Sequence, residues 1–287
     1  MNGFINLNKP SGTSSAFALN CIKRKIKNVK VGHTGTLDPM ASGVLPVAIG
    51  KSTRLFDYML DKKKVYIAEF TFGYETDTLD KLGNTLKTGG KIPPVSDIEK
   101  VIPALVGSVM QVPPSFSAKN VSGVRSYDLA RKGIAVDLPP KKVEIYSIIL
   151  KNSQEKSGVF TFEITCGGGT YIRSIARDMA KLLNAYCTMT ALERVKSGVF
   201  DIKNSVSAEE IKNAETLGDF LIPPDKVIDL NEYFINEKEE ENLYFGRPFF
   251  VPLSDGFYAI KRESTRELLC VGGVTDKNLK IKVNLKE

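Results

Sequence analysis

Hydrophobic residues follow two different periods along this chain, and each period predicts a different kind of element. Over residues 159–166, apolar side chains alternate with polar ones, which predicts a strand with one buried face. The continuous apolar run over 44–49 predicts a strand buried on both faces. Aromatic and β-branched residues predict a strand over 62–72, and a fourth strand is expected over 142–150.

Apolar residues three and four positions apart predict helices between these strands. Such a stripe contains Ile172, Ile175, Met179 and Leu182, directly after a run of three glycines. A second helix is expected over 15–28. Two capping boxes, Ser96-x-x-Glu99 and Ser207-x-x-Glu210, predict the starts of two further helices. Residues 216–225 have the composition of a linker, and short strands follow beyond it.

The stretch 32–46 interrupts this pattern with three glycines and two prolines, so it predicts a stiff loop joined to a buried strand. The loop contains His33, the only histidine of the chain, and Asp38, which Pro39 biases toward an extended backbone. A carboxylate on such a loop is a candidate for chemistry. An ordinary Asp-Pro turn is the alternative interpretation.

Composition and charge limit the classes of protein. The chain has 287 residues, a net charge of +7 and a pI near 9.0, which favours a polyanionic partner. Residues 225–287 hold ten basic and twelve acidic residues, so the positive charge belongs to the first 224. The four cysteines are far apart, which argues against a zinc site or a disulfide framework. We expect a cytoplasmic protein, because neither a secretory signal nor a membrane span is recognisable.

Three stretches suggest ligands or partners. Residues 112–140 interleave basic, aromatic and hydroxyl side chains, which suits a segment that grips a nucleic-acid backbone. The acidic turn over 73–83 is either a solvated turn or the source of a carboxylate that holds a neighbouring arginine. Glycines 167–169 before a helix are of the kind that cradle a phosphate. The sequence Gly50-Lys51-Ser52 lacks the other glycine of a phosphate loop, so no ATP site is predicted.

Several motifs resemble one known family. Gly-His-Thr-Gly-Thr-Leu-Asp-Pro, followed by Ala-Ser-Gly-Val-Leu-Pro, resembles the catalytic motif of the tRNA pseudouridine synthase B (TruB) family. Lys-Pro-x-Gly-x-Ser-Ser, Pro-Pro-x-x-Ser-Ala-x-Lys and Cys-Gly-Gly-Gly-Thr-Tyr-Ile-Arg resemble further family motifs in the expected order. The chain departs from the family at Asn8, Glu193 and Val195. The resemblance covers residues 3–225, whereas the match of the C-terminal part is weaker.

The resemblance implies a fold and an activity. The fold is α/β (α+β), with a mixed, largely antiparallel central sheet flanked by helices and a small β-rich PUA-like domain at the C-terminus. The implied domains are a catalytic domain over 1–224, with an RNA-gripping segment over about 112–140, and an RNA-binding module over 225–287. The implied enzyme is an isomerase that converts uridine 55 in the TΨC loop of tRNA to pseudouridine. It needs no cofactor and no metal, and we expect a monomer.

The resemblance also assigns site residues. Asp38 is the essential catalytic residue, Arg173 pairs with it, and Tyr66 stacks on the target base and is a candidate acceptor of the C5 proton. His33 would occupy the space that the flipped base leaves, and Leu192 lines the uracil pocket. The remaining expected contacts to RNA are Lys9, Lys119, Arg125, Tyr127, Arg131 and Tyr171.

The carboxylate must be ionised whether it attacks the nucleotide or removes the C2′ proton, and bidentate pairing with Arg173 would favour that state. The residues leave both routes open. Two other classes compete with this interpretation. A catalytically silent RNA-binding protein would not need Asp38, Tyr66 and Arg173 together. A nucleotide-using transferase lacks its phosphate-binding motif.

Overall fold

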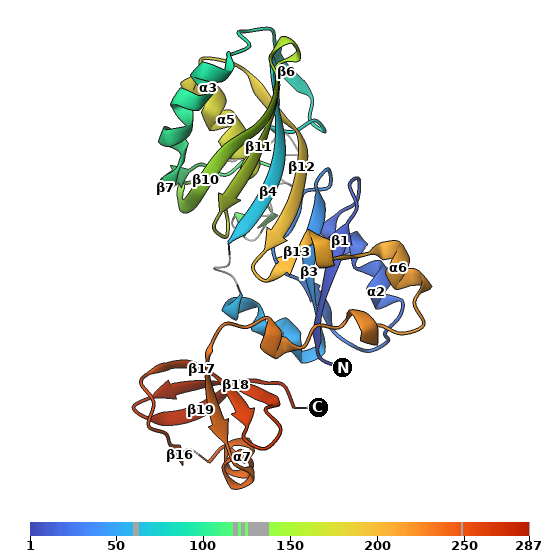
Figure 1. Cartoon of the computed structure of the whole chain (residues 1–287), viewed down its shortest axis with the longest axis vertical. Coiled ribbons are helices and arrows are strands. Elements are labelled where there is room, and N and C mark those ends of the chain that lie inside the picture. Colours follow the sequence, from blue (N-terminus) through green and yellow to red (C-terminus); the bar gives the residue numbers. More distant parts are fainter. Residues whose placement is uncertain (60–62, 117–119, 122–123, 126–137, 248, 287) are drawn as a thin grey trace.

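The computed structural model describes residues 1–59, 63–116, 120–121, 124–125, 138–247 and 249–286. It consists of one large sheet with helices packed on it and a second, smaller sheet at the C-terminal end (Figure 1). In this part of the chain, no helix is long and apolar enough to cross a bilayer. The strands of the large sheet are β1 (Gly3–Lys9), β2 (Val31–His33), β3 (Ser42–Ile49), β4 (Lys64–Phe72), β7 (Gly107–Gln111), β10 (Lys141–Gln154), β11 (Val159–Cys166), β12 (Cys187–Ser197), β13 (Phe200–Asp201) and β14 (Val206–Ser207).

The large sheet has the order β14-β1-β3-β12-β4-β11-β10-β7, with β13 paired to β12 and β2 paired to β3. Only the β1–β14 and β12–β3 pairs of these described strands are parallel. The predicted mixed, largely antiparallel sheet is therefore confirmed. Two small hairpins lie outside it and consist of β5 (Tyr74–Thr76) with β6 (Thr85–Thr88) and β8 (Asn120–Val121) with β9 (Val124–Arg125).

Helices cover one face of the sheet in its upper part, where α3 (Val95–Val101) and α5 (Ile172–Leu182) lie side by side (Figure 1). The predicted stripe of α5 is confirmed for Ile172, Ile175 and Met179, which are buried. Leu182 is instead 49% exposed, because the helix ends there. Short 3₁₀ turns connect other elements: η1 (Gly50–Tyr58), η2 (Ile102–Leu105), η3 (Glu155–Ser157), η4 (Ile202–Asn204), η5 (Gly218–Phe220) and η6 (Pro224–Lys226).

Two of the predicted helix boundaries are wrong. The helix expected over 15–28 is divided into α1 (Ser15–Ala18) and α2 (Asn20–Lys23). Continuing it would place Lys23 and Lys27 one turn apart with like charges. The capping box at Ser96 is absent, because Pro94 supplies the extended N-cap and α3 begins at Val95.

The second predicted capping box is confirmed. The Ser207 hydroxyl accepts from the Glu210 amide at 3.1 Å, and the Glu210 carboxylate accepts from the Ser207 amide at 2.8 Å. These two bonds satisfy backbone donors at the start of α6 (Ala208–Asn213).

The two halves of the large sheet meet at a very short parallel pairing. Strands β3 and β12 are paired only through Ser42 with Glu193 and Gly43 with Arg194. Gly43 has a φ of +100°, and a Cβ there would lie 2.3 Å from the backbone oxygen of Arg194. Only glycine permits this approach. The loop that precedes β3 is therefore held at the junction of the two halves.

The C-terminal sheet has the order β15-β17-β18-β19-β16. Apolar residues from both sheets, including Phe4, Val44, Val271 and Val283, form one shared cluster. The predicted linker is not a free segment, since the backbone of Ile222 exchanges two 2.8 Å hydrogen bonds with that of Phe4. The elements of this part are β15 (Asn231–Ile235), α7 (Glu237–Tyr244), β16 (Phe249–Phe250), β17 (Gly256–Arg262), β18 (Leu268–Thr275) and β19 (Asn278–Asn284).

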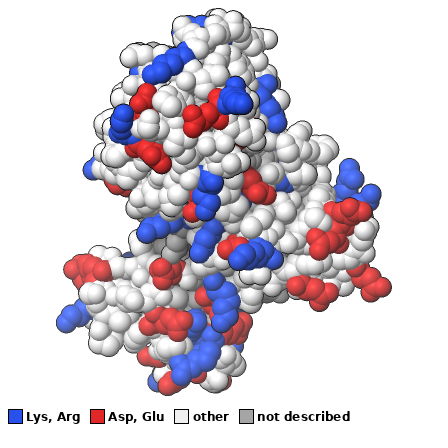
Figure 2. All heavy atoms as spheres, turned by 45° about the horizontal axis from the view of Figure 1, so that its top comes forward, with Lys and Arg blue, Asp and Glu red and all other residues white. Residues whose placement is uncertain are grey.

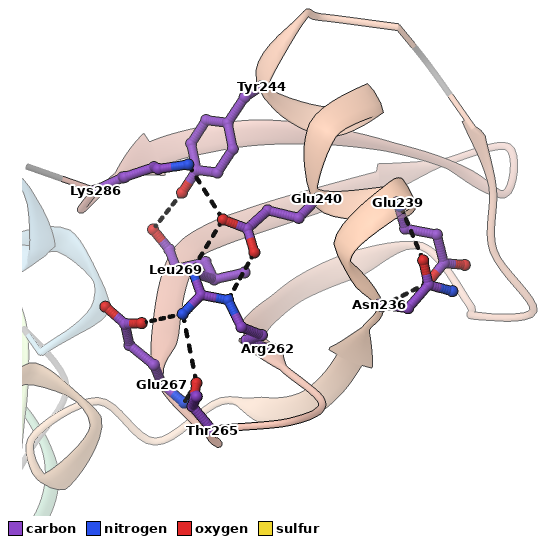
Figure 3. Close-up of polar contacts among 9 residues, drawn as sticks. All are labelled: Asn236, Glu239, Glu240, Tyr244, Arg262, Thr265, Glu267, Leu269 and Lys286. Carbon is purple, nitrogen blue, oxygen red and sulfur yellow. Dashed lines mark hydrogen bonds and ion pairs between the residues drawn. The ribbon is translucent and has the colours of Figure 1, made fainter.

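A network of ion pairs connects the elements of the C-terminal part (Figure 3). The Arg262 guanidinium donates to both carboxylate oxygens of Glu240, at 2.8 and 3.0 Å, and also to Glu267. Lys286 adds a contact to Glu240 at 3.2 Å. These bonds tie α7 to β17 and to the end of the chain. Sequence analysis predicted neither α7 nor this network.

Candidate active site

The loop between β2 and β3, residues 34–41, presents Asp38. It is held by the turn that follows β1. The Ser15 hydroxyl donates to the carbonyl of Leu37 at 3.0 Å and accepts from the Leu37 amide at 2.9 Å. The Ser11 hydroxyl donates to the carbonyl of Met40 at 2.7 Å. The backbone on both sides of Asp38 is therefore fixed by side chains from a distant turn.

Lys9 belongs to the same support. Its side chain is fully buried, and the ammonium group donates to the carbonyls of Pro10, Thr13 and Pro39 at 2.9, 2.7 and 3.4 Å. Burial lowers the pKa of this ammonium group to about 8, although the nearby Asp38 opposes the shift. The resemblance implied an RNA contact for Lys9, and that role stays a prediction. In the structure its ammonium group donates to two carbonyls of the turn after β1 and to one carbonyl of the Asp38 loop.

Asp38 and Arg173 meet as the resemblance implied. The Arg173 Nη2 donates to the Asp38 Oδ1 at 2.8 Å. The guanidinium is 5% exposed, whereas the Asp38 side chain is 31% exposed. The carboxylate therefore lies at the boundary between the buried arginine and solvent, where a substrate can reach it.

The two terminal nitrogens of Arg173 make further contacts that fix the orientation of its guanidinium. Nη1 donates to the carbonyl of Thr78 at 2.9 Å and Nη2 to the carbonyl of Phe116 at 3.0 Å. The buried Asp80 lies 3.5 Å from Nη1 and accepts from the Thr78 hydroxyl at 2.8 Å. Of the two interpretations of the acidic turn, the one in which a carboxylate holds an arginine is confirmed for Asp80.

The electrostatics of Asp38 differ from the expectation. Burial raises the pKa of its carboxyl group, Asp80 raises it further, and Arg173 and Lys9 oppose the shift. The predicted bidentate pair is wrong, because a single 2.8 Å contact joins the two side chains. Arg173 cannot present a full fork, since its other contacts are to carbonyls and to Asp80.

Tyr66 and Leu192 form apolar neighbours on β4 and β12. Tyr66 is 6% exposed and Leu192 is 7% exposed, and both belong to the main hydrophobic cluster. Burial raises the pKa of the Tyr66 hydroxyl, and the charge of Arg194 and its side-chain hydrogen bond to Tyr66 oppose this. Asp38 is close enough for its charge to raise the same pKa. The structure thus brings Asp38, Arg173 and Tyr66 into one site.

Sequence analysis missed Arg194. This residue is 1% exposed and faces Tyr66 across the β4–β12 pair. Its Nε donates to the carbonyl of Val44 at 2.7 Å and its Nη2 to that of Gly35 at 2.8 Å. The alternation of Leu192 and Arg194 with Glu193 along the strand was the signal that could have placed it on the buried face.

His33 and Tyr171 lie at the edges of the site. His33 ends β2; its Nδ1 is buried without a hydrogen-bond partner among the described residues, and burial lowers the pKa of its ring. Tyr171 is the N-cap of α5. The amide side chain of Gln111 makes reciprocal bonds with its backbone, at 2.8 and 3.1 Å, so this end of α5 is fixed.

The other predicted RNA contacts fall in or beside the undescribed stretch. Lys119, Tyr127 and Arg131 lie outside the described residues, and Arg125 is described only as part of the β9 backbone. Their roles stay predictions.

A cavity with both polar and apolar lining residues lies next to Gly35, on the loop that presents Asp38. It has a volume of about 390 Å³, and its lining includes Gly35, Lys64 and Lys141. Figure 2 shows Lys and Arg side chains across the middle of one face, more acidic side chains on the right-hand lobe, and both kinds at the lower end. Within the described ranges, no group of three or more His, Cys, Asp or Glu residues is arranged to hold a metal ion.

A family model decides the family of this chain. Residues 23–172 match the family described as TruB family pseudouridylate synthase (N terminal domain). The chain belongs to this family. Asp38 and Tyr66 lie within the matched residues and Arg173 follows them directly, and the catalytic roles of the three residues stay predictions.

Relatives of known name support this TruB assignment along nearly the whole chain. A protein of Clostridium kluyveri named tRNA pseudouridine synthase B is 42% identical over 79% of this chain and 78% of its own length. A protein of the same name from Clostridium acetobutylicum is 35% identical over 98% of both chains.

Solved structures agree with the TruB fold. A chain in the structure of an H/ACA RNP bound to a substrate RNA containing 2′-deoxyuridine matches with a TM-score of 0.72 and 22% identity, covering 99% of this chain and 85% of its own. A chain of the archaeal box H/ACA sRNP Nop10-Cbf5 complex also has a TM-score of 0.72, at 21% identity, with coverage of 99% and 86%. At this identity the likeness bears on the fold alone.

Proposed function

We propose that this TruB family enzyme converts uridine 55 in the TΨC loop of tRNA to pseudouridine. The observation that carries the proposal is the partly exposed Asp38 carboxylate, 2.8 Å from a buried Arg173 and beside Tyr66. Relatives named tRNA pseudouridine synthase B, at up to 42% identity over most of the chain, support tRNA as the substrate.

The reaction is a rearrangement within one nucleotide. The bond from ribose C1′ to uracil N1 breaks, the base turns, C1′ joins C5, and the C5 proton is lost while N1 gains one. Atoms and electrons balance without a redox partner. The target base must leave its stack to reach Asp38, which costs a few kcal/mol.

Asp38 acts as the ionised carboxylate on either of two routes. It attacks the nucleotide as a nucleophile, or it removes the C2′ proton so that a glycal forms. In both routes Arg173 stabilises the negative charge and orients the carboxylate.

Tyr66 supplies the apolar surface against which the flipped uracil stacks. Burial raises the pKa of its hydroxyl group, so the neutral phenol is present at pH 7. The transfer of the C5 proton to Tyr66 stays a prediction. Leu192, buried on the next strand, contributes to the same apolar surface.

The finer assignments belong to this proposal as well. Residues 225–287 would act as a PUA-like RNA-binding module, and the basic surface would hold the phosphate backbone of the TΨC stem-loop. Residues 112–140 would grip the RNA. The enzyme would act as a monomer in the cytoplasm.

The test uses an unmodified tRNA TΨC stem-loop, incubated with wild-type protein and with Asp38→Ala, followed by an assay for pseudouridine. We expect product from the wild type and none from the variant, with both proteins binding the RNA. Product at an undiminished rate from Asp38→Ala would refute the assignment. Binding without product by the wild type would favour the silent RNA-binding protein.

A further inference from the structure

Arg194 combines full burial with an unusual set of partners. It is 1% exposed, and among the ion pairs of the described residues none involves its guanidinium. A fully buried arginine ordinarily has a carboxylate partner, because an uncompensated charge is costly inside a protein. Here the described hydrogen-bond partners are two backbone carbonyls, and Tyr66 lies opposite Arg194 on the neighbouring strand.

The two carbonyls flank the loop that presents Asp38. Gly35 precedes the carboxylate by three residues, and Val44 lies in β3 just after the loop. The hydrogen bonds to them, at 2.8 and 2.7 Å, pin both ends of the loop to β12. Any movement of the loop away from β12 would remove carbonyl partners that offset the buried charge.

Two glycines allow the backbone around the loop to approach Arg194 closely. Gly35 has a φ of +67°, and a Cβ there would lie 3.1 Å from the Nη1 of Arg194. Gly43 lets the β3 backbone approach that of Arg194 itself. Larger residues at either position would displace the arginine or the loop.

The same guanidinium reaches Tyr66. The two residues are direct cross-strand partners in the β4–β12 pair, and the charge of Arg194 acts on the Tyr66 hydroxyl. Arg194 therefore joins the loop of Asp38 to the side chain that the base would stack on. Asp38 lies on the loop before β3 and Tyr66 lies on β4, and Arg194 contacts the backbone of the loop while facing Tyr66 across the strand pair.

We propose that Arg194 is a positioning residue that sets the placement of the Asp38 carboxylate relative to the Tyr66 ring. It contacts no substrate itself. The planar fork of arginine suits this role, because it directs several donors at once along fixed directions. A lysine would retain the charge and lose the fork.

This inference rests on the proposed function, since its readout is the rate of pseudouridine formation. The experiment measures the single-turnover rate and the dissociation constant for the TΨC stem-loop with Arg194→Lys, Tyr66→Phe and the double variant. We expect Arg194→Lys to lower the rate about 100-fold, the size of effect that a small misplacement produces. The dissociation constant should change by less than about twofold, because phosphate contacts elsewhere supply the binding.

The double variant separates positioning from simple loss of packing. If Arg194 acts through the Tyr66 hydroxyl, the lysine substitution should cost clearly less in the Tyr66→Phe background than in the wild type. Equal costs in both backgrounds would overturn the link to Tyr66. A weaker dissociation constant with an unchanged rate would make Arg194 an RNA contact and overturn the proposal.

Two controls keep the test decisive. Arg54→Lys makes the same substitution at an exposed position of η1 and should leave the rate unchanged. If Arg194→Lys does not fold, Gly35→Ala perturbs the same contact with the arginine retained, and it should lower the rate at unchanged affinity; unchanged rates would contradict the proposal. Wild-type protein without product would refute the proposed function, whereas active wild type with an equally active Arg194→Lys would refute only this inference.

Discussion

Arg173 in the large sheet region and Arg262 in the C-terminal part are each placed between two carboxylates, and each lowers the pKa of the principal one, but the net shifts of the two carboxyl groups are opposite. Arg262 gives Glu240 a full fork, at 2.8 and 3.0 Å, and the pKa of that carboxyl group is lowered, chiefly by this hydrogen bonding. Arg173 gives Asp38 one contact, and burial raises the pKa of Asp38.

The difference in net pKa shift comes first from burial, which outweighs the effect of Arg173 on Asp38, and then from where the donors of each arginine go. The terminal nitrogens of Arg173 also contact two backbone carbonyls and Asp80, so little of its capacity reaches Asp38. Glu240 also accepts a hydrogen bond from the Lys286 ammonium group. A carboxylate that accepts hydrogen bonds at both oxygens stabilises a fold. A carboxylate with a single partner and a partly exposed side chain can still react.

The largest expected effect comes from exchanging each arginine for lysine. Arg173→Lys should lower the single-turnover rate by about 100-fold, since a point charge cannot hold three segments in one geometry. Arg262→Lys should lower the melting temperature and leave the rate unchanged. Rate measurements and thermal melts on both variants check this. A loss of activity in Arg262→Lys equal to that in Arg173→Lys would remove the distinction between the two sites.

Asp80→Asn should change both the rate and the pKa of Asp38, and its effect on the rate should be smaller than that of Arg173→Lys. The rate should fall about 10-fold, because Arg173 loses a partner that orients it. The pKa of Asp38 should fall, because a like charge that raises it is removed. The pH profile of the single-turnover rate measures both effects. An acid limb that moves to higher pH would contradict the assigned influence of Asp80.

Glu240→Gln should affect stability alone. The amide loses the charge that binds Arg262 and Lys286, at a cost of about 2 kcal/mol in the free energy of unfolding. Chemical denaturation measures this cost, and the rate on the TΨC stem-loop should equal that of the wild type. As a matched control, Glu239→Gln removes a charge next to it while keeping a side-chain acceptor for the capping box of α7.

The smallest expected effect concerns acid: activity and folded structure should be lost at different pH values. The raised pKa of Asp38 means that the active carboxylate protonates at a higher pH than an ordinary aspartate. Glu240 has a lowered pKa, so its contribution to stability is present above the pKa of unfolded glutamate and is lost only as pH falls through the folded value. Activity should therefore fall while circular dichroism is still native. Simultaneous loss of both signals would contradict this order.

The main features of the site could be predicted from the sequence because its motifs are local. Asp38 and Arg173 were identified within continuous stretches, and the structure joins them at 2.8 Å. Two other roles depend on burial. Lys9 was expected on RNA from the family resemblance, and its ammonium group is enclosed by three carbonyls. Arg194 was not singled out, although its alternation with Glu193 along the strand is the pattern of a buried face.

In the fold too, features that depend on neighbouring residues were predicted, whereas features that depend on distant contacts were not. Strand periods predicted individual strands, since alternation depends on neighbouring residues only, whereas the mixed, largely antiparallel sheet was implied by the family resemblance. Helix limits were less well predicted: α2 ends at Lys23 although apolar spacing continues to Ile26. The pairing of β3 with β12 is set by the close approach at Gly43, a contact between segments about 150 residues apart that no local period encodes.

That distant pairing has a consequence for synthesis on the ribosome. The loop with Asp38 is made early, but Arg173 and the strand of Arg194 follow much later in translation. A nascent chain that ends before residue 187 has the carboxylate and lacks the strand that anchors its loop. The pairing that anchors this loop can form only after β12 has been synthesised and has taken its place between β3 and β4.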